Sequence, residues 1–334
     1  MKIEFAPMEG IVNHVYRRAH AQCFTGIHRY FAPFIVADQT KGFMEKDLQD
    51  ILPENNKGYV LIPQILTNNA SDFINTANKI AAFGYSEINL NLGCPSKTVV
   101  SGGRGSGFLS DVEGLRRFFE AIFASPQVRI SVKTRIGRYG PEEFDRLLEI
   151  YNDYPLTELI IHPRIRTDMY NNTPNYQVFK EALQKSKHAT VYNGDVRTYV
   201  EYRKIYNDYG KVNGATTSGE NTATNRVITG VMIGRGLLAN PALAEVIASP
   251  SRLVTLEDYR RFHACLLEHQ EAYLLMPHKV LSKMKEVWRY LAMALEVPKP
   301  LYRAMQQSQT LETYSSAVES LFNEASVISE VLRT

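Results

Sequence analysis

The chain has 334 residues, of which 44% are hydrophobic and 22% charged, and its formal net charge is +3 at pH 7. This length exceeds one typical domain and predicts a barrel of roughly 250 residues followed by a smaller module. No apolar run reaches the ~20 residues of a membrane helix, and Glu4 and Glu9 interrupt the N-terminal stretch where a signal peptide is apolar, so we expect a cytoplasmic protein without a membrane partner.

Eight short strand-like runs recur along the chain, mostly at intervals of about 30 residues, the length of a strand–loop–helix–loop unit. They lie near residues 3, 29, 59, 87, 129, 158, 189 and 230. Between them, residues 71–85 and 114–124 carry apolar side chains at spacings of three and four, typical of amphipathic helices. Eight such units predict an α/β fold, a (β/α)8 TIM barrel over residues 1–245, with its chemistry at the carboxyl ends of the strands.

Two segments depart from the repeat. Residues 214–225, GATTSGENTATN, are small and polar and indicate a surface loop. Residues 246–334 show helical patterns only, which predicts a smaller all-helical C-terminal domain. Within residues 278–295 one helical face collects the apolar residues Val280, Met284, Val287, Trp288, Leu291 and Leu295.

Cations surround that apolar face. They include Lys279, Lys283, Lys285 and Arg289, together with Lys299 and Arg303, and they outnumber Glu286 and Glu296. The net charge of the whole chain is too small to indicate a nucleic-acid partner, so this local excess is the strongest such signal. A solvated helix face explains the same pattern, and the sequence leaves both readings open.

Residues 87–100, EINLNLGCPSKTVV, run from a buried-looking strand into a Gly-Cys-Pro turn. Such a strand end holds the backbone while the loop exposes the side chain, so Asn91 and Cys94 are candidates for an open site. The alternative for Cys94 is a small buried hydrophobic residue. The three cysteines, Cys23, Cys94 and Cys265, are an odd number without metal-ligand spacing, which argues against a disulfide framework and a metal site.

Polar residues and glycines, together with Met8, follow most of the other strand-like runs as well. These are Met8, Glu9, Gln64, Lys133, Arg135, His162, Arg164, Asn193, Gly194, Asp195, Gly234, Arg235 and Gly236. The Asn-Gly-Asp and Gly-Arg-Gly motifs follow the seventh and eighth strands, where barrels commonly bind phosphate through backbone amides and a helix N-terminus. The pair implies a phosphate-bearing cofactor, although either motif alone could simply form a tight turn.

Three of these residues suit a flavin. Lys133 could place its ammonium beside a ring that gains negative charge on reduction. Gln64 both donates and accepts hydrogen bonds, as the edge of an isoalloxazine requires, and His162 can bond ring or phosphate. The alternatives are a salt-bridged Lys133 and a structural imidazole at His162.

Taken together, these motifs resemble the tRNA-dihydrouridine synthase family of flavin-dependent enzymes, most closely the bacterial C-type members. The similar segments are APMEG at 6–10, Gln64, NLGCPSKTV at 91–99, GRGSGFL at 103–109, VKTR at 132–135, His162-x-Arg164, NGDV at 193–196 and VMIGRG at 231–236. The resemblance implies an FMN-containing barrel followed by a helical tRNA-binding domain, with NADPH as the reductant.

By this resemblance, a set of rim residues would line the FMN: Pro7, Met8, Gln64, Lys133, His162, Asn193, Gly194, Asp195, Gly234 and Arg235. Cys94 would be the catalytic proton donor, Asn91 a contact to the uracil, and Arg164 and Tyr170 neighbours of the substrate. The chain departs from the family at Pro163, which stands where a glycine is usual, and at the polar loop of residues 214–225.

The implied reaction reduces one uridine of tRNA to 5,6-dihydrouridine, with hydride from flavin N5 to C6 and a proton from Cys94 to C5. The alternatives are an FMN barrel acting on a free pyrimidine, a Schiff-base lyase using Lys133, and a tRNA-binding protein without catalysis. Similarity to the C-type members favours position 16 of the D-loop. No obligate protein partner is indicated, so we expect a monomer.

Overall fold

The structure is a computed structural model that describes residues 1–38, 42–124, 126–211 and 226–328. Ten strands pair in parallel into one sheet, in the order β3-β5-β6-β7-β8-β9-β10-β1-β2-β4. The strands are β1 Lys2–Phe5, β2 Arg29–Phe31, β3 Ile35–Val36, β4 Leu61–Ile62, β5 Gln64–Leu66, β6 Glu87–Leu92, β7 Arg129–Arg135, β8 Leu159–His162, β9 Thr190–Tyr192 and β10 Gly230–Ile233.

The sheet closes on itself through two interrupted strands. β4 pairs with β2 and β5 pairs with β3, while only Pro63 separates β4 from β5. Proline has no N–H to donate to the ladder, so a strand that contains one is interrupted there. With β2/β3 and β4/β5 each counted as one strand, the ten segments fill eight positions of a closed barrel. The predicted (β/α)8 barrel is confirmed, with all eight strand-like runs in place.

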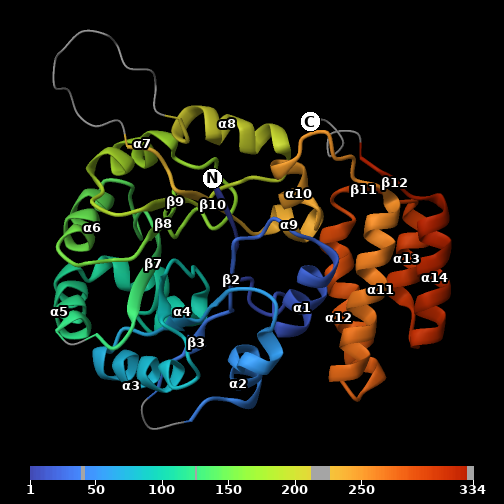
Figure 1. Cartoon of the computed structure of the whole chain (residues 1–334), viewed down its shortest axis with the longest axis horizontal. Helices are drawn as coiled ribbons and strands as arrows, with labels where there is room; N and C mark the ends of the chain where they lie inside the picture. Colours follow the sequence, from blue (N-terminus) through green and yellow to red (C-terminus); the bar gives the residue numbers. More distant parts are fainter. Residues whose placement is uncertain (39–41, 125, 212–225, 329–334) are drawn as a thin grey trace.

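Helices cover the outside of the barrel (Figure 1). They are α1 His14–Cys23, α2 Glu45–Ile51, α3 Ala70–Ala81, α4 Lys97–Ser101, α5 Val112–Phe123, α6 Glu143–Asn152, α7 Tyr176–Lys185, α8 Tyr199–Tyr209, α9 Arg235–Ala239 and α10 Leu243–Ala248. The two helices predicted from periodicity are α3 and α5. Asn69 and Asp111 cap them by accepting backbone N–H bonds, and both helices bury their apolar faces.

The barrel interior is layered because alternate residues of each strand point inward. β8 and the residue before it illustrate the layers, with Glu158 at the bottom, Ile160 in the middle and His162 at the top. At the bottom, Arg29 pairs with Glu4, Glu87 and Glu158. The middle is an apolar cluster of Ala6, Phe31, Ile62, Ile160, Val191 and Met232. The filled lower layers leave only the top layer open for a ligand.

A helical layer follows the barrel and lies beside it (Figure 1). It contains α11 Leu256–Tyr273, α12 Pro277–Leu291, α13 Lys299–Gln307 and α14 Leu311–Glu324, with a small antiparallel pair, β11 Leu295–Glu296 and β12 Ser326–Val327. This pair corrects the expectation of helices alone: α12 ends at Leu291, and Leu295 is buried in β11. The other five residues of the predicted apolar face are buried in α12.

The helical layer shares its core with the barrel. α1 packs along α11, where the ring of Phe262 contacts Tyr16 and His20. One apolar cluster runs through both parts, and the predicted boundary between residues 245 and 246 falls inside α10. The polar loop of residues 214–225 lies outside the described residues. Among the described helices, none combines the length and hydropathy needed to cross a bilayer.

Candidate functional site

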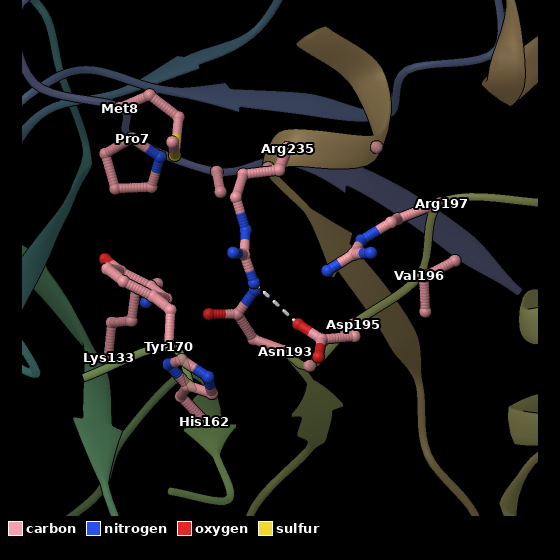
Figure 2. A pocket seen from close by; sticks show the side chains of 14 residues that line it. Pro7, Met8, Lys133, His162, Tyr170, Asn193, Asp195, Val196, Arg197 and Arg235 are labelled. Atoms are coloured by element: carbon pink, nitrogen blue, oxygen red, sulfur yellow. Dashed lines mark hydrogen bonds and ion pairs between the residues drawn. The ribbon is translucent and has the colours of Figure 1, made fainter. Parts of the chain in front are cut away.

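A cavity opens at the carboxyl ends of the strands. Its predicted lining residues are Pro7, Met8, Lys133, His162, Tyr170, Asn193, Gly194, Asp195, Gly234 and Arg235, and Ala6, Val196, Arg197 and Gly236 complete it (Figure 2). Sequence reasoning missed Ala6, Val196 and Arg197 as site residues. Arg197 had a local signal, because it is a cation two residues beyond the Asn-Gly-Asp turn.

Two glycine-containing loops meet at one side of the cavity. Asn193, after β9, donates from its Nδ2 to the carbonyl oxygen of Met232 in β10, at 2.9 Å. A Cβ at Gly236 would overlap the carbonyl oxygen of Val196, so only glycine allows this close approach of α9 to the loop. The approach brings the first residues of α9 beside the Asn-Gly-Asp turn, an arrangement suited to an anion.

Asp195 holds two arginines at this side. Its Oδ2 accepts from Arg164 Nη2 at 2.5 Å. Its Oδ1 accepts from Arg235 Nη2 at 2.8 Å, as Figure 2 shows. Burial alone would raise the pKa of Asp195, but the hydrogen bonds and charge of Arg164 and the charge of Arg235 outweigh it and lower the pKa. Asp195 therefore stays ionised and orients Arg235. Arg164 is buried behind it and is absent from the cavity lining.

His162 is neutral in this setting. Burial lowers the pKa of His162 well below its usual value, and the charges of Arg135, Lys133 and Arg164 lower it further. Arg164 Nη1 lies 3.2 Å from His162 Nε2, and a guanidinium can only donate, so Nε2 accepts. The proton is then on Nδ1, which makes His162 a hydrogen-bond donor for a group in the cavity.

Lys133 is half-buried in β7 and lines the cavity. Burial lowers the pKa of Lys133 to about 8, with a smaller effect from the charge of Arg135 and an opposing one from Cys94. An anionic ligand beside the ammonium would offset this cost and restore the charge. The described residues that line the cavity carry three cations, Lys133, Arg197 and Arg235, against the single carboxylate of Asp195. The cavity is therefore suited to a ligand with negative charge.

Arg135 and Tyr170 shape the opposite wall. Arg135 is buried and donates to the carbonyl oxygens of Gly93, Ile165 and Met169 at 3.0, 2.8 and 2.7 Å. The Tyr170 ring contacts two guanidinium groups, with its centroid 5.3 Å from the guanidinium carbon of Arg135 and 4.8 Å from that of Arg235. Figure 2 shows Tyr170 and Arg235 in the cavity wall. Arg135 thereby ties the loop after β6 to the loop that presents Tyr170.

Gln64 and Asn91 lie outside the cavity lining, in a chain of buried amides. Asn91 Nδ2 donates to Gln64 Oε1, and Gln64 Nε2 donates to Asn89 Oδ1, both at 2.7 Å. Asn89 in turn donates to Ser131 Oγ at 3.0 Å. At the upper end, Asn91 Oδ1 accepts from the backbone N–H groups of Gly93 and Cys94 at 3.0 and 2.9 Å. The chain therefore fixes the turn that carries Cys94.

Cys94 is half-buried at this turn. Burial raises the pKa of the Cys94 thiol above its usual value, although Lys133 and Arg135 are near enough for their charges to oppose the rise. The thiol is therefore protonated at neutral pH. Gly105 packs against the turn with φ +55°, and a Cβ there would meet the carbonyl oxygen of Cys94. The Gly-rich segment after α4 thus closes over the turn.

The four cations predicted on α12 fall into two pairs. Lys279 and Arg289 are exposed. Lys283 and Lys285 are half-buried and bond within the protein: Lys283 Nζ donates to Gly10 O at 2.7 Å, and Lys285 Nζ donates to Ser308 O. The prediction treated all four as cations available to phosphates. In the structure Lys279 and Arg289 are exposed, whereas Lys283 and Lys285 bond backbone carbonyls; contact of any of the four with tRNA stays a prediction.

Comparisons with known proteins find relatives along most of the chain. A family model described as dihydrouridine synthase matches residues 4–327. A probable tRNA-dihydrouridine synthase of Staphylococcus aureus (strain Mu50) is 24% identical over 293 residues, which cover 85% of this chain and 82% of that protein. A tRNA-dihydrouridine(16) synthase of Yersinia pestis is 27% identical over 263 residues, which cover 74% and 76%.

Solved structures share the fold. An old yellow enzyme homologue from Zymomonas mobilis superposes with a TM-score of 0.52 at 11% identity, covering 76% of this chain and 90% of that one. Morphinone reductase superposes with a TM-score of 0.51 at 12% identity, covering 78% and 90%. At such identities the likeness extends to the barrel architecture alone.

Proposed function

The chain belongs to the dihydrouridine synthase family, and from this premise we propose that it is an FMN- and NADPH-dependent enzyme that reduces one uridine of tRNA to 5,6-dihydrouridine. The observation that carries the proposal is the cavity itself, where Lys133, Arg197 and Arg235 outnumber the single carboxylate and two glycine-containing loops meet. The protonated thiol of Cys94 lies outside the lining but near enough to Lys133 for their charges to interact. The flavin, when bound, supplies the hydride for C6 of the uracil.

The residues present fit FMN. The Asn-Gly-Asp turn and the first residues of α9 suit its phosphate, with Arg235 held in position by Asp195. Lys133 offsets negative charge on the ring, and the Nδ1–H of His162 donates to ring or phosphate. Contact between Gln64 and the ring edge stays a prediction, because Gln64 is fully buried beneath the cavity.

Cys94 would hold the proton that C5 of the uracil receives. Its raised pKa keeps the thiol protonated at neutral pH, as a general acid requires. Asn91 would act first as a positioning residue, because its Oδ1 accepts the N–H of Cys94, and its contact to the uracil stays a prediction. Tyr170 is the wall residue best placed for the substrate, since its ring is 47% exposed. Arg164 would act through Asp195.

The tRNA would approach the open end of the barrel beside α12. This helix packs against α9, whose first residue is Arg235, so α12 lies beside the cavity. The target base must leave its stack to reach the cavity, and contacts to the tRNA backbone offset that cost of a few kcal/mol.

Two experiments test the proposal. Purified protein should absorb near ~450 nm and release FMN on denaturation in about one-to-one ratio. tRNA from cells that lack the protein should miss dihydrouridine at one position, and uridine 16 is the first to examine. A colourless protein that takes up no FMN would rule out the flavin assignment and leave the lyase alternative. A yellow protein that reduces a free pyrimidine but no tRNA would rule out tRNA as the substrate.

A further inference from the structure

Cys23 and Cys265 meet across the seam between the barrel and the helical layer. Cys23 is the last residue of α1, and Cys265 lies midway along α11, which packs against α1. The two thiols lie close enough for each to shift the pKa of the other. Cys265 Sγ also lies 3.9 Å from the carbonyl oxygen of Ala19, one turn before Cys23. Both cysteines are free and half-buried.

The surrounding contacts fix this end of α1 against α11. Arg261 Nη2 donates to the carbonyl oxygen of Cys23 at 3.0 Å, and its guanidinium lies 5.4 Å from the ring centroid of Phe24. Farther along α11, His269 Nε2 is 2.8 Å from Gln22 Oε1. Contacts on both sides of Cys265 therefore hold the two thiols together without a covalent bond.

The two thiols differ in acidity. Interaction with Cys23 lowers the pKa of Cys265, and the charge of Arg261 lowers it further, while burial and Glu268 oppose the shift. Interaction with Cys265 and burial raise the pKa of Cys23. Cys265 is thus the more acidic thiol of the pair, and the thiolate is the nucleophile in disulfide exchange.

We propose that Cys23 and Cys265 are a redox modification site, which a low-molecular-weight disulfide converts to a reversible disulfide bond between α1 and α11. The Cys265 thiolate attacks one sulfur of the oxidant RSSR, forming a mixed disulfide and releasing RS⁻. Cys23 then loses its proton and attacks Cys265 Sγ, which expels the second RS⁻. The protein loses two electrons and two protons, and RSSR becomes two thiols.

The bond would join segments that are distant in the sequence but adjacent in the fold. A disulfide restricts the unfolded chain most when it closes a long loop. Because the helices are already packed, we expect the bond to raise the thermal unfolding midpoint by roughly 5 to 10 °C. Neither cysteine lines the cavity at the strand ends, so the FMN content should not change on oxidation.

The test uses the full chain with its flavin, incubated with oxidised glutathione and then alkylated. We expect a loss of two of the three thiols, a peptide cross-linked through Cys23 and Cys265 in the mass spectrum, and full reversal by dithiothreitol. Cys94→Ser is the matched control and should still form the cross-link. Cys23→Ser should instead keep glutathione on Cys265, because no second thiol resolves the mixed disulfide.

Three outcomes would overturn the proposal. One is a wild-type protein that keeps all three thiols in excess oxidised glutathione. Another is glutathione on Cys265 of the wild-type protein with Cys23 still free. The last is a cross-link that contains Cys94. Because the decisive readout is the peptide mass in the unsubstituted protein, a variant that folds poorly would leave this result intact.

Discussion

The ammonium of Lys283, in α12, donates a hydrogen bond of 2.7 Å to the carbonyl oxygen of Gly10, two residues after Met8 in the cavity wall. This bond joins the helical layer to the barrel rim. The cations of α12 thus fall into two groups. Lys283 and Lys285 bond backbone carbonyls of other segments, whereas Lys279 and Arg289 face solvent. The first prediction follows from this division.

Replacing Lys279 and Arg289 with alanine should weaken tRNA binding and flatten the dependence of the affinity on salt. With fewer contacts to phosphates, binding releases fewer counterions. Flavin reduction by NADPH should not change. The measurement is tRNA affinity across a salt series. The matched control replaces two exposed residues, Lys180 in α7 and Lys187 just after it, and should bind as the wild type does. Helix α7 lies across the barrel from α12 (Figure 1). Unchanged affinity and salt slope in the Lys279/Arg289 variant would place the docking surface elsewhere.

Cys94→Ala should keep its FMN and oxidise NADPH normally, yet reduce uridine more slowly by about 10²- to 10⁴-fold, because only the proton donor is lost. Single-turnover reoxidation of the reduced enzyme by tRNA measures this step. Cys265→Ser removes a thiol outside the cavity and serves as the control. A wild-type rate in Cys94→Ala would remove Cys94 from the reaction.

FMN affinity should fall as pH rises through about 8, because the Lys133 ammonium, whose pKa in the free protein is about 8, loses its proton there. In Lys133→Met this step should disappear, and affinity should be lower below pH 8. Fluorescence titration of the flavin-free protein between pH 6 and 9.5 measures both effects. Identical pH profiles for the two proteins would show that Lys133 does not contact the flavin.

Glu158, at the bottom of the barrel, should make the protein less stable as pH rises. Burial, with the charge of Glu4 added, raises the pKa of Glu158 from 4.5 to about 8. The folded state therefore keeps a proton that the unfolded state releases, so the free energy of unfolding decreases between about pH 4.5 and 8. In Glu158→Gln this decrease should be smaller. Urea unfolding across that range tests it, and the exposed Glu120→Gln should behave as the wild type does.

Arg29→Met should cost about 3 to 5 kcal/mol of stability, because it leaves three buried carboxylates without their shared cation. The loss should be smaller at low pH, because burial raises the pKa of Glu4 and Glu158 and their protonated forms need no cation. Urea unfolding at pH 5 and pH 8 measures both. A loss that does not depend on pH would mean that the packing of the Arg29 side chain, and not its charge, stabilises this end of the barrel.

The sequence by itself determined the repeat of strands and helices and the residues at the strand ends. These features follow from local rules: alternation along a strand, spacing along a helix, and glycine at a tight turn. Residues that directly follow parallel strands must meet at one end of a barrel. For this reason Lys133, His162, Asn193 and Arg235 could be assigned to one cavity before any contact was known.

Only the tertiary structure decided what each side chain does there. Asp195 orients Arg235, Asn91 fixes the turn of Cys94, and Lys283 bonds a backbone carbonyl of the barrel rim. Cys23 meets Cys265 although most of the chain separates them. Each of these relations depends on how distant segments pack, and hydrogen bonds form only at the short distances that packing sets. Composition and periodicity carry no record of those distances.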